Sequence, residues 1–120
     1  MIKLIATDMD GTLLDSEGRL NIEIYDIIEK LKSMGIMFAA ASGRQLMSLK
    51  RKFFPVDDDV IYIAENGGYA VRRDEELYIN AMDHDIVEEI LDTAEKIDDV
   101  ALFICGKNIH IPICLSLRRS

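Results

Sequence analysis

Two carboxylates near the amino terminus, Asp8 and Asp10, are separated by one residue and followed by Gly11 and Thr12. They come directly after residues 3–7, an apolar run typical of a short buried strand. In open parallel sheets ligands bind outside the carboxyl ends of the strands, so these side chains are candidates for a site. Two close carboxylates raise each other's pKa unless a cation lies between them, and Mg²⁺ prefers such oxygen ligands. We therefore expect a metal site at Asp8 and Asp10.

A second polar cluster follows the next apolar run. Ser42, Gly43 and Arg44 come where residues 36–41 end, directly before a predicted helix. A hydroxyl, a glycine N–H and a helix N-terminus can together bind a phosphate, and Gly11 lets the first loop approach an anion closely. Carboxylates with a metal beside a phosphate-binding loop favour phosphoryl transfer through an aspartyl-phosphate.

These motifs resemble those of a known superfamily. Residues 8–14, Asp-Met-Asp-Gly-Thr-Leu-Leu, are similar to the first motif of the haloacid dehalogenase superfamily of phosphohydrolases, and residues 41–44, Ala-Ser-Gly-Arg, to the second. Residues 65–68, Glu-Asn-Gly-Gly, resemble the Cof-type branch, which carries a large α/β cap inserted after the third strand. The resemblance extends over residues 1 to about 105. It implies a Mg²⁺-dependent phosphohydrolase of small phosphorylated metabolites.

The resemblance also implies roles for single residues. Asp8 would be the nucleophile that takes the phosphoryl group, and Asp10 the acid/base that protonates the leaving oxygen and then activates water. The Asp8 side chain and the Asp10 backbone carbonyl would hold Mg²⁺. The implied phosphate- and substrate-binding residues are Met9, Gly11, Thr12, Ser42, Gly43, Arg44 and Asn66.

Two further family motifs are not recognisable in this chain: a Lys, sometimes Arg, that neutralises the phosphate, and an acidic strand end that completes the metal site. The chain therefore resembles the first half of such an enzyme, truncated within its cap. Since removing one electrostatic element typically lowers a rate 10²–10³-fold, we expect weak Mg²⁺ binding and an isolated chain that is nearly inactive.

The elements that must position these residues predict an α/β fold. Their order up to residue 64, β-loop-α-β-α-β, predicts part of a three-layer, parallel-sheet core at residues 1–82. Antiparallel patterns then predict the start of an α/β cap at residues 83–120. The predicted strands are residues 3–7, 36–41, 60–64, 69–72, 77–80, 100–105 and 109–117, and the predicted helices are 21–35, 45–53 and 85–94.

Local signals predict how several elements begin and end. Asn21 is a candidate N-cap and Gly35 a candidate helix stop, while Asp85 with Glu88 is typical of a capping box. Residues 57–59, three successive aspartates, indicate a solvated turn.

Composition restricts partners and location. Of 120 residues, 49% are hydrophobic and 30% charged, which is typical of a globular chain. The net charge of −8 argues against binding nucleic acid or an anionic membrane surface. No apolar run approaches the ~20 residues of a membrane span, and the amino terminus does not resemble a signal peptide. Cys105 and Cys114 then indicate half-buried thiols in a cytoplasmic protein.

Two other functions remain open at this stage. One is a receiver-like phosphoacceptor module, which has a similar length and also uses an aspartyl-phosphate with Mg²⁺. The other is a non-catalytic remnant that self-associates. An open edge at the first strand and the alternating apolar residues of 109–117 predict a dimer or higher oligomer, with Ile111 and Ile113 at its interface.

Overall fold

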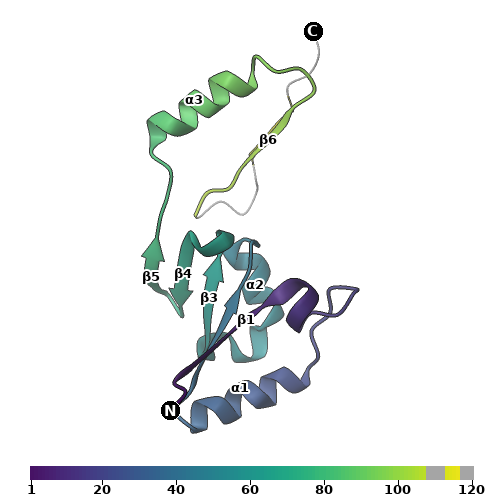
Figure 1. Cartoon of the computed structure of the whole chain (residues 1–120), viewed down its shortest axis with the longest axis vertical. Coiled ribbons are helices and arrows are strands. Elements are labelled where there is room, and N and C mark those ends of the chain that lie inside the picture. Colours follow the sequence, from purple (N-terminus) through teal and green to yellow (C-terminus); the bar gives the residue numbers. More distant parts are fainter. Residues whose placement is uncertain (108–112, 117–120) are drawn as a thin grey trace. The chain divides into compact units, whose positions relative to one another are not determined.

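The computed structural model describes residues 1–107 and 113–116. The chain divides into two compact units, Met1–Asn80 and Ala81–Ser120. The first unit contains a sheet with helices, and the second contains a helix and a hairpin (Figure 1). The core and cap domains predicted at residues 1–82 and 83–120 stay a prediction.

The first unit alternates strands and helices in the predicted order. Its regular elements are β1 (Leu4–Asp8), α1 (Glu23–Ser33), β2 (Met37–Ala41), α2 (Leu46–Lys52), β3 (Val60–Ala64), β4 (Tyr69–Arg72) and β5 (Glu75–Ile79), with short helical turns at Met9–Leu13, Phe54–Asp59 and Glu65–Gly67. The elements agree with the sequence expectations within one or two residues at most ends. The exception is β5, which begins at Glu75, so the two glutamates predicted to lie in a turn belong to the strand.

The five strands form one sheet in the order β1-β2-β3-β4-β5. β1, β2 and β3 are parallel, as predicted, and the hairpin of β4 and β5 extends the sheet antiparallel to β3. This confirms the α/β class with a parallel-dominated, mixed sheet. In receiver-like folds the first strand lies between the second and third. Here β2 lies between β1 and β3, so the receiver-like alternative is wrong.

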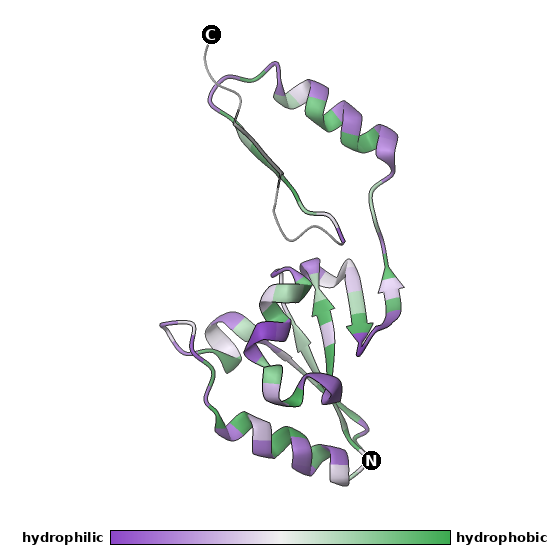
Figure 2. Cartoon of the chain, turned by 180° about the vertical axis from the view of Figure 1, so that it is seen from behind, coloured by the Kyte–Doolittle hydropathy of each residue, from purple (hydrophilic) through white to green (hydrophobic). Residues whose placement is uncertain are grey.

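The core lies between the sheet and both helices of the first unit. Residues of α1 and α2 pack in one cluster with alternate residues of β2 and β3, because every second strand residue points to the same face. The members are Met9, Leu14, Ile24, Ile28, Phe38, Ala40, Leu49, Phe53, Val56, Val60, Tyr62 and Ala64. Hydrophobic and hydrophilic residues alternate along the α1 ribbon (Figure 2). This packing holds β2, β3 and, through Met9, the turn that follows β1.

Helix α1 is capped much as its sequence indicates. The Asn21 side chain accepts a hydrogen bond from the Glu23 N–H at 3.0 Å, although the backbone of Ile22 is the formal N-cap. Gly35 follows the helix with a φ of 72°, the left-handed conformation that terminates helices. The predicted stop at Gly35 is confirmed.

The aspartates at 57–59 do not form the predicted solvated turn. They belong to the helical turn Phe54–Asp59, and two of them are partly buried by ion pairs. Lys32 Nζ lies 2.7 Å from Asp59 Oδ1, and Lys50 Nζ lies 3.5 Å from Asp57 Oδ2. The prediction was wrong because the cations come from other elements: Lys32 belongs to α1, far back in the sequence, and Lys50 to α2, directly before this turn.

The second unit contains α3 (His84–Ala94) and an antiparallel pair, β6 (Ala101–Ile104) with β7 (Ile113–Ser116). The predicted capping box is wrong: Asp83 is the N-cap, no side chain caps the helix, and Glu88 pairs with His84 instead. Ile113 pairs with Ile104 in register. The rest of the predicted strand, residues 109–112 and 117, lies outside the described residues. This includes Ile111.

Two further sequence expectations concern exposure. Cys105 is a free, exposed thiol, not the half-buried one predicted. Among the described residues, every helix is too short or too polar to cross a membrane.

Candidate active site

The carboxyl ends of β1, β2 and β3 lie next to one another at one end of the sheet. Asp8, the last residue of β1, pairs in register with Ala41, the last residue of β2, and Ala41 pairs with Ile63 of β3. The Ser42 N–H donates to the Ile63 carbonyl at 2.9 Å, which joins the loop after β2 to β3. The two predicted motifs therefore lie side by side, although 34 positions separate Asp8 from Ser42.

The loop after β1 is a wide helical turn, Met9–Leu13. It closes through a hydrogen bond from the Leu14 N–H to the Met9 carbonyl at 2.9 Å, and Gly11 adopts a φ of 75°, which glycine tolerates best. The Met9 side chain is fully buried in the core, so only its backbone can face a ligand. Asp10, Gly11 and Thr12 are exposed. The buried Met9 side chain thus fixes the start of a turn whose next three residues are exposed.

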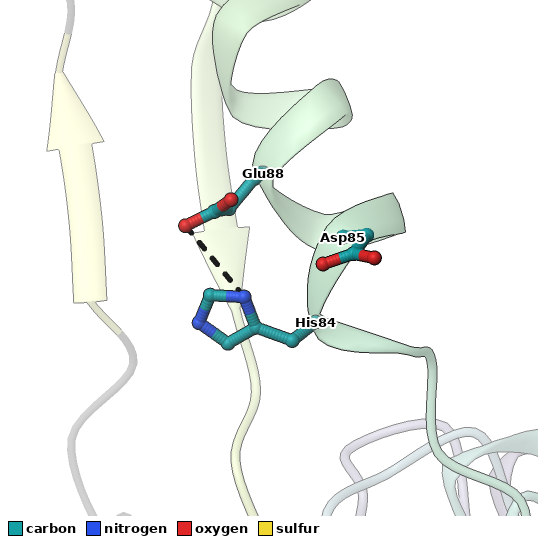
Figure 3. Close-up of side chains that lie close together, drawn as sticks. All are labelled: His84, Asp85 and Glu88. Carbon is teal, nitrogen blue, oxygen red and sulfur yellow. Dashed lines mark ion pairs between the residues drawn. The ribbon is translucent and has the colours of Figure 1, made fainter.

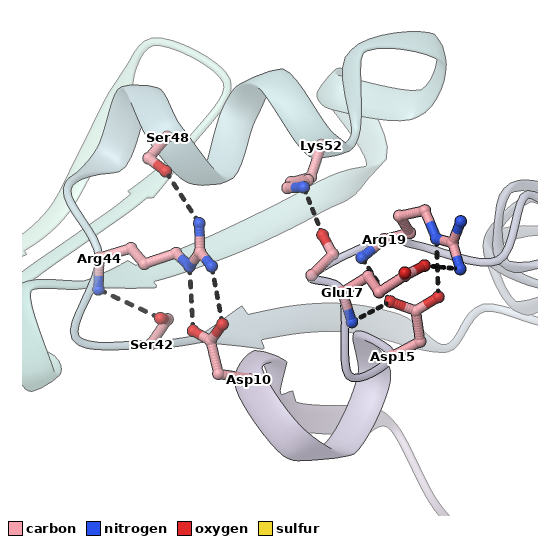
Figure 4. Close-up of polar contacts among 9 residues, drawn as sticks. Asp10, Asp15, Glu17, Arg19, Ser42, Arg44, Ser48 and Lys52 are labelled. Atoms are coloured by element: carbon pink, nitrogen blue, oxygen red, sulfur yellow. Dashed lines mark hydrogen bonds and ion pairs between the residues drawn. The ribbon is translucent and has the colours of Figure 1, made fainter.

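Asp10 and Arg44 form a bidentate ion pair between the two loops. Arg44 Nε lies 2.9 Å from Asp10 Oδ2, and Arg44 Nη2 lies 2.7 Å from Asp10 Oδ1 (Figure 4). Hydrogen bonds from Arg44 are the main cause that lowers the pKa of the Asp10 carboxyl below its usual value. Asp10 is therefore ionised at neutral pH, and Arg44 is oriented toward the first motif.

The loop after β2 is tied to the loop after β3. The Ser42 hydroxyl accepts from the Arg44 N–H at 3.1 Å, and the Ser42 carbonyl accepts from the Asn66 N–H at 3.1 Å. A Cβ atom added to Gly43 would lie 2.7 Å from Asn66 Oδ1, a distance that real side chains do not tolerate. Gly43 is thus required for the close approach of the Asn66 side chain.

The turn after β3 has an unusual backbone. Glu65 and Asn66 are both left-handed, with φ of 53° and 54°. Such conformations cost of order 1–3 kcal/mol each for residues other than glycine and cluster at functional sites. The Glu65 N–H donates to the Arg44 carbonyl at 3.0 Å, so this turn is fastened to the second motif.

Asp8 differs from Asp10 in its partners. In the described part of the chain, no side chain pairs with the Asp8 carboxylate, and its carbonyl accepts from its neighbour, the Thr7 hydroxyl, at 3.0 Å. The exposed Asp8 carboxylate and the backbone carbonyl of Asp10 in the following turn offer hard oxygen ligands, which fit Mg²⁺. The structure thus brings five predicted residues into direct contact: Asp10, Ser42, Gly43, Arg44 and Asn66. Asp8 lies at the carboxyl end of β1, at the same end of the sheet.

Sequence reasoning missed Lys52 as a neighbour of this site. Lys52 Nζ donates to the Gly18 carbonyl at 2.6 Å and so fastens α2 to the loop that follows the first motif. Its charge contributes, less than Arg44, to the lowered pKa of Asp10. Ser48 and Lys52 are four residues apart on one face of α2, and Arg44 Nη1 lies 3.5 Å from Ser48 Oγ (Figure 4). This spacing could have revealed Lys52.

A second cluster lies at the start of α3. The ligand atoms of His84, Asp85 and Glu88 lie within 4.8 Å of one another, and His84 Nδ1 is 3.6 Å from Glu88 Oε1 (Figure 3). All three are exposed, and the positive end of the helix dipole opposes a bound cation there. These side chains are therefore surface residues.

Comparisons with known proteins agree on one family. The model of the haloacid dehalogenase-like hydrolase family matches residues 5–112. A 5-amino-6-(5-phospho-D-ribitylamino)uracil phosphatase of Escherichia coli is 32% identical over 108 residues, 89% of this chain and 40% of that protein. A phosphatase of the same name from Bacillus subtilis is 28% identical over 93% of this chain and 35% of its own length.

Solved structures show the same similarity. A Streptococcus mutans UA159 protein, SMU.1108c, matches with a TM-score of 0.77 at 26% identity, over 89% of this chain and 41% of that one. A haloacid dehalogenase-like hydrolase from B. subtilis matches with a TM-score of 0.67 at 26% identity, over 79% and 34%. The chain thus spans about two fifths of the length of these relatives.

Proposed function

The chain belongs to the haloacid dehalogenase-like hydrolase family, and from this we propose that its first unit carries the nucleophile and the phosphate-binding loop of a Mg²⁺-dependent phosphatase. The substrates are small phosphorylated metabolites, as the printed names of the phosphatase relatives suggest. The observation that carries the proposal is the bidentate contact between Asp10 and Arg44. It joins the loop after β1 to the loop after β2 at the carboxyl ends of these strands.

Asp8 acts as the nucleophile in this proposal. One of its carboxylate oxygens forms a bond to phosphorus while the bond from phosphorus to the leaving oxygen breaks, which gives an aspartyl-phosphate. Asp10 supplies a proton to the leaving oxygen. Asp10 then takes a proton from the water that attacks the aspartyl-phosphate, and phosphate and free Asp8 are released. The free state of the Asp8 carboxylate supports this role, because no cation has to be displaced from it.

Asp10 cannot donate a proton while both its oxygens accept from Arg44. A phosphate group has the same planar complementarity to a guanidinium as a carboxylate. We therefore assign Arg44 a change of partner: it leaves Asp10 for a phosphoryl oxygen when substrate binds, and Asp10 becomes free to take up a proton. Met9, Gly11, Thr12, Ser42 and Gly43 bind phosphate in this proposal through hydroxyls and backbone N–H groups, and Asn66 approaches the substrate.

The Asp8 side chain and the Asp10 carbonyl are the groups that fit Mg²⁺. The cation would offset the charge of the phosphate, which the net charge of −8 otherwise repels. Two protein ligands are few, so binding is weak. Calorimetric titration should show this weak binding lost in Asp8→Asn, and unchanged binding in that variant would put the ligands elsewhere.

The same proposal places the chain in the cytoplasm, where the exposed Cys105 thiol stays reduced. The isolated chain is nearly inactive in turnover, because neither the phosphate-neutralising cation nor the completing acidic ligand of the family has been recognised. A turnover number for p-nitrophenyl phosphate in the usual range of ~1–10³ s⁻¹ would contradict this.

Stoichiometric phosphorylation tests the assignment of the nucleophile without requiring turnover. We expect acetyl phosphate with Mg²⁺ to add one phosphoryl group per chain, at Asp8, by intact mass and peptide mapping. Asp8→Asn should abolish the label. The control is Asp26→Asn, a carboxylate in the first turn of α1 that is also exposed, and this variant should keep the label.

Two results would overturn the proposal. A label that survives Asp8→Asn means that another residue accepts the phosphoryl group. No label in the folded wild-type chain favours the second function considered above, a non-catalytic remnant.

A further inference from the structure

The turn after β3 holds three successive residues in left-handed backbone. Glu65, Asn66 and Gly67 have φ of 53°, 54° and 91°. Glycine adopts this conformation freely and asparagine tolerates it, but a glutamate adopts it only at a cost in free energy. Among the described residues, Arg73 and Asp99 are the other left-handed residues besides glycine, and each occurs singly. The turn after β3 is therefore strained, and its neighbours must hold it.

The left-handed backbone aims two neighbouring N–H groups at the loop after β2, residues 42–45. The Glu65 N–H donates to the Arg44 carbonyl at 3.0 Å, and the Asn66 N–H donates to the Ser42 carbonyl at 3.1 Å. In an extended strand successive N–H groups point to opposite sides, so only one of the two could reach this loop. In a turn of this kind successive N–H groups point to the same side. The strained conformation is thus what allows both hydrogen bonds.

These hydrogen bonds fix the direction of the Gly43 N–H. A trans peptide is planar and has its C=O and N–H on opposite sides, and the described residues contain no cis peptide bond. Since the Ser42 carbonyl points at Asn66, the Gly43 N–H of the same peptide points away from the turn after β3. β2 lies between β1 and β3, so this N–H faces the side on which Asp8 ends β1. The Gly43 N–H is one of the donors that bind phosphate in the proposed function.

We propose that Glu65 is a positioning residue, whose left-handed backbone holds the loop after β2 so that the Gly43 N–H is aimed at the phosphate before substrate binds. Glu65 acts through its backbone and does not touch the phosphate. The turn is held from its other side, because the Gly68 N–H donates to the Glu65 carbonyl at 3.1 Å and the Asn80 N–H donates to the Gly68 carbonyl at 2.8 Å. This role rests on the proposed function, which assigns phosphate to the loop after β2.

Substitutions of Glu65 separate its backbone from its carboxylate. Glu65→Val and Glu65→Gly both remove the carboxylate, but valine is β-branched and disfavours left-handed backbone, whereas glycine adopts it freely. We expect the rate at which acetyl phosphate labels Asp8 to fall about 10²-fold in Glu65→Val, as a misplacement of about 1 Å can cause. The rate should stay at the wild-type level in Glu65→Gly. Glu65→Asn should also keep it, because asparagine tolerates the same backbone.

Binding of inorganic phosphate gives a readout that needs no chemistry at Asp8. In an NMR titration with inorganic phosphate and Mg²⁺, the Gly43 amide signal of the wild-type chain should shift, and Glu65→Val should need higher phosphate concentrations for the same shift. The Glu65 and Asn66 amides should be protected from hydrogen exchange in the wild type and in Glu65→Gly, but not in Glu65→Val. The matched control is Arg73→Val, which places valine at a left-handed residue beside Asp58, at the amino end of the parallel strands. This control should bind phosphate like the wild type, and circular dichroism checks that each variant is folded.

Equal losses in Glu65→Val and Glu65→Gly would overturn the positioning role, because the carboxylate itself would then act. So would wild-type rate and binding in a folded Glu65→Val, or an equal loss in Arg73→Val. If Glu65→Val does not fold, the role is overturned by Glu65 and Asn66 amides that exchange freely in the wild type, or by weakened phosphate binding in Glu65→Gly. A wild-type Gly43 amide that does not respond to phosphate also overturns it. If Gly43 responds as expected but Asp8 is not labelled, the positioning role stands and the assignment of the nucleophile fails.

Discussion

The two ends of the parallel strands in the first unit carry similar charged residues but use them differently. At the amino end, Asp57 and Asp59 are partly buried and paired with Lys50 and Lys32, and Asp57 also accepts from the buried Tyr62 hydroxyl at 2.6 Å. An open depression of about 410 Å³ lies there, but the ion pair of Lys32 and Asp59 lies in its wall. This end is built for stability.

At the carboxyl end, the groups are exposed and the backbone is strained. Asp8 has no side-chain partner among the described residues, and the partner of Asp10 is a side chain that a phosphate can attract. Left-handed residues occur there at Gly11, Glu65 and Asn66, whereas Arg73 is the left-handed residue beside the aspartates of the amino end. The comparison teaches that carboxylates and cations alone do not indicate a site. What distinguishes the site is Asp8, an exposed carboxylate without a side-chain partner among the described residues, beside two successive left-handed residues, Glu65 and Asn66.

Among the changes that distinguish the two ends of the parallel strands, Gly43→Ala should have the largest effect, a loss of rate. The new Cβ displaces the Asn66 side chain, and misplacement by about 1 Å can lower a rate about 10²-fold. Because Asn66 is exposed and can move outward, the free energy of unfolding should change little. Phosphorylation by acetyl phosphate measures the rate, and a thermal melt measures the stability.

A double variant shows whether Gly43→Ala acts through Asn66. Combined with Asn66→Ala, which removes the obstructed atoms, Gly43→Ala should lower the rate no further. Additive losses would mean that the methyl group disturbs the loop after β2 itself.

Tyr62→Phe tests the amino end, with a smaller effect on a different quantity. The lost hydrogen bond to Asp57 should lower the free energy of unfolding by about 1–2 kcal/mol, near the lower end for charged acceptors because Asp57 stays half-exposed. Phosphorylation of Asp8 should be unaffected. Tyr78→Phe, on the exposed β5, is the control and should leave stability unchanged.

The same tyrosine predicts a pH dependence. Burial, with the hydrogen bond to Asp57, raises the pKa of Tyr62 well above its ordinary value of 10.0. The phenol thus stays protonated in the folded chain while it ionises in the unfolded one, so its contribution to stability is complete below pH 10 and is lost as pH rises further. Urea titrations above pH 10 should show a steeper loss of stability in the wild type than in Tyr62→Phe.

The smallest expected effect is that of Arg44→Ala on stability, because the side chains of Asp10 and Arg44 are 58% and 34% exposed and solvent screens their ion pair. The pKa of the Asp10 carboxyl should nevertheless rise toward its ordinary value, since Arg44 is the main cause that lowers it. Carboxyl chemical shifts in an NMR titration measure this rise. An unchanged pKa would mean that the two loops do not meet in solution, and would remove the main support for the site.

Local signals explain what could be predicted. Apolar periodicity and the glycine after α1 place the helices and strands of the first unit within one or two residues, because neighbouring residues determine them. The positions of Asp8 and Ser42 at strand ends followed from the same patterns. Where the decisive contact was distant, local signals misled: residues 57–59 were predicted to be solvated, yet cations from two helices pair with them.

The sequence by itself determined the chemistry available to this protein: two carboxylates after the first strand, a hydroxyl and a glycine after the second, and a net charge of −8, which repels anions. Only the tertiary structure decided which groups meet. The pairing of Asp10 with Arg44 and the approach of Asn66 to Gly43 both depend on strand order. Strand order is set by packing between residues far apart in the chain, which no local pattern records.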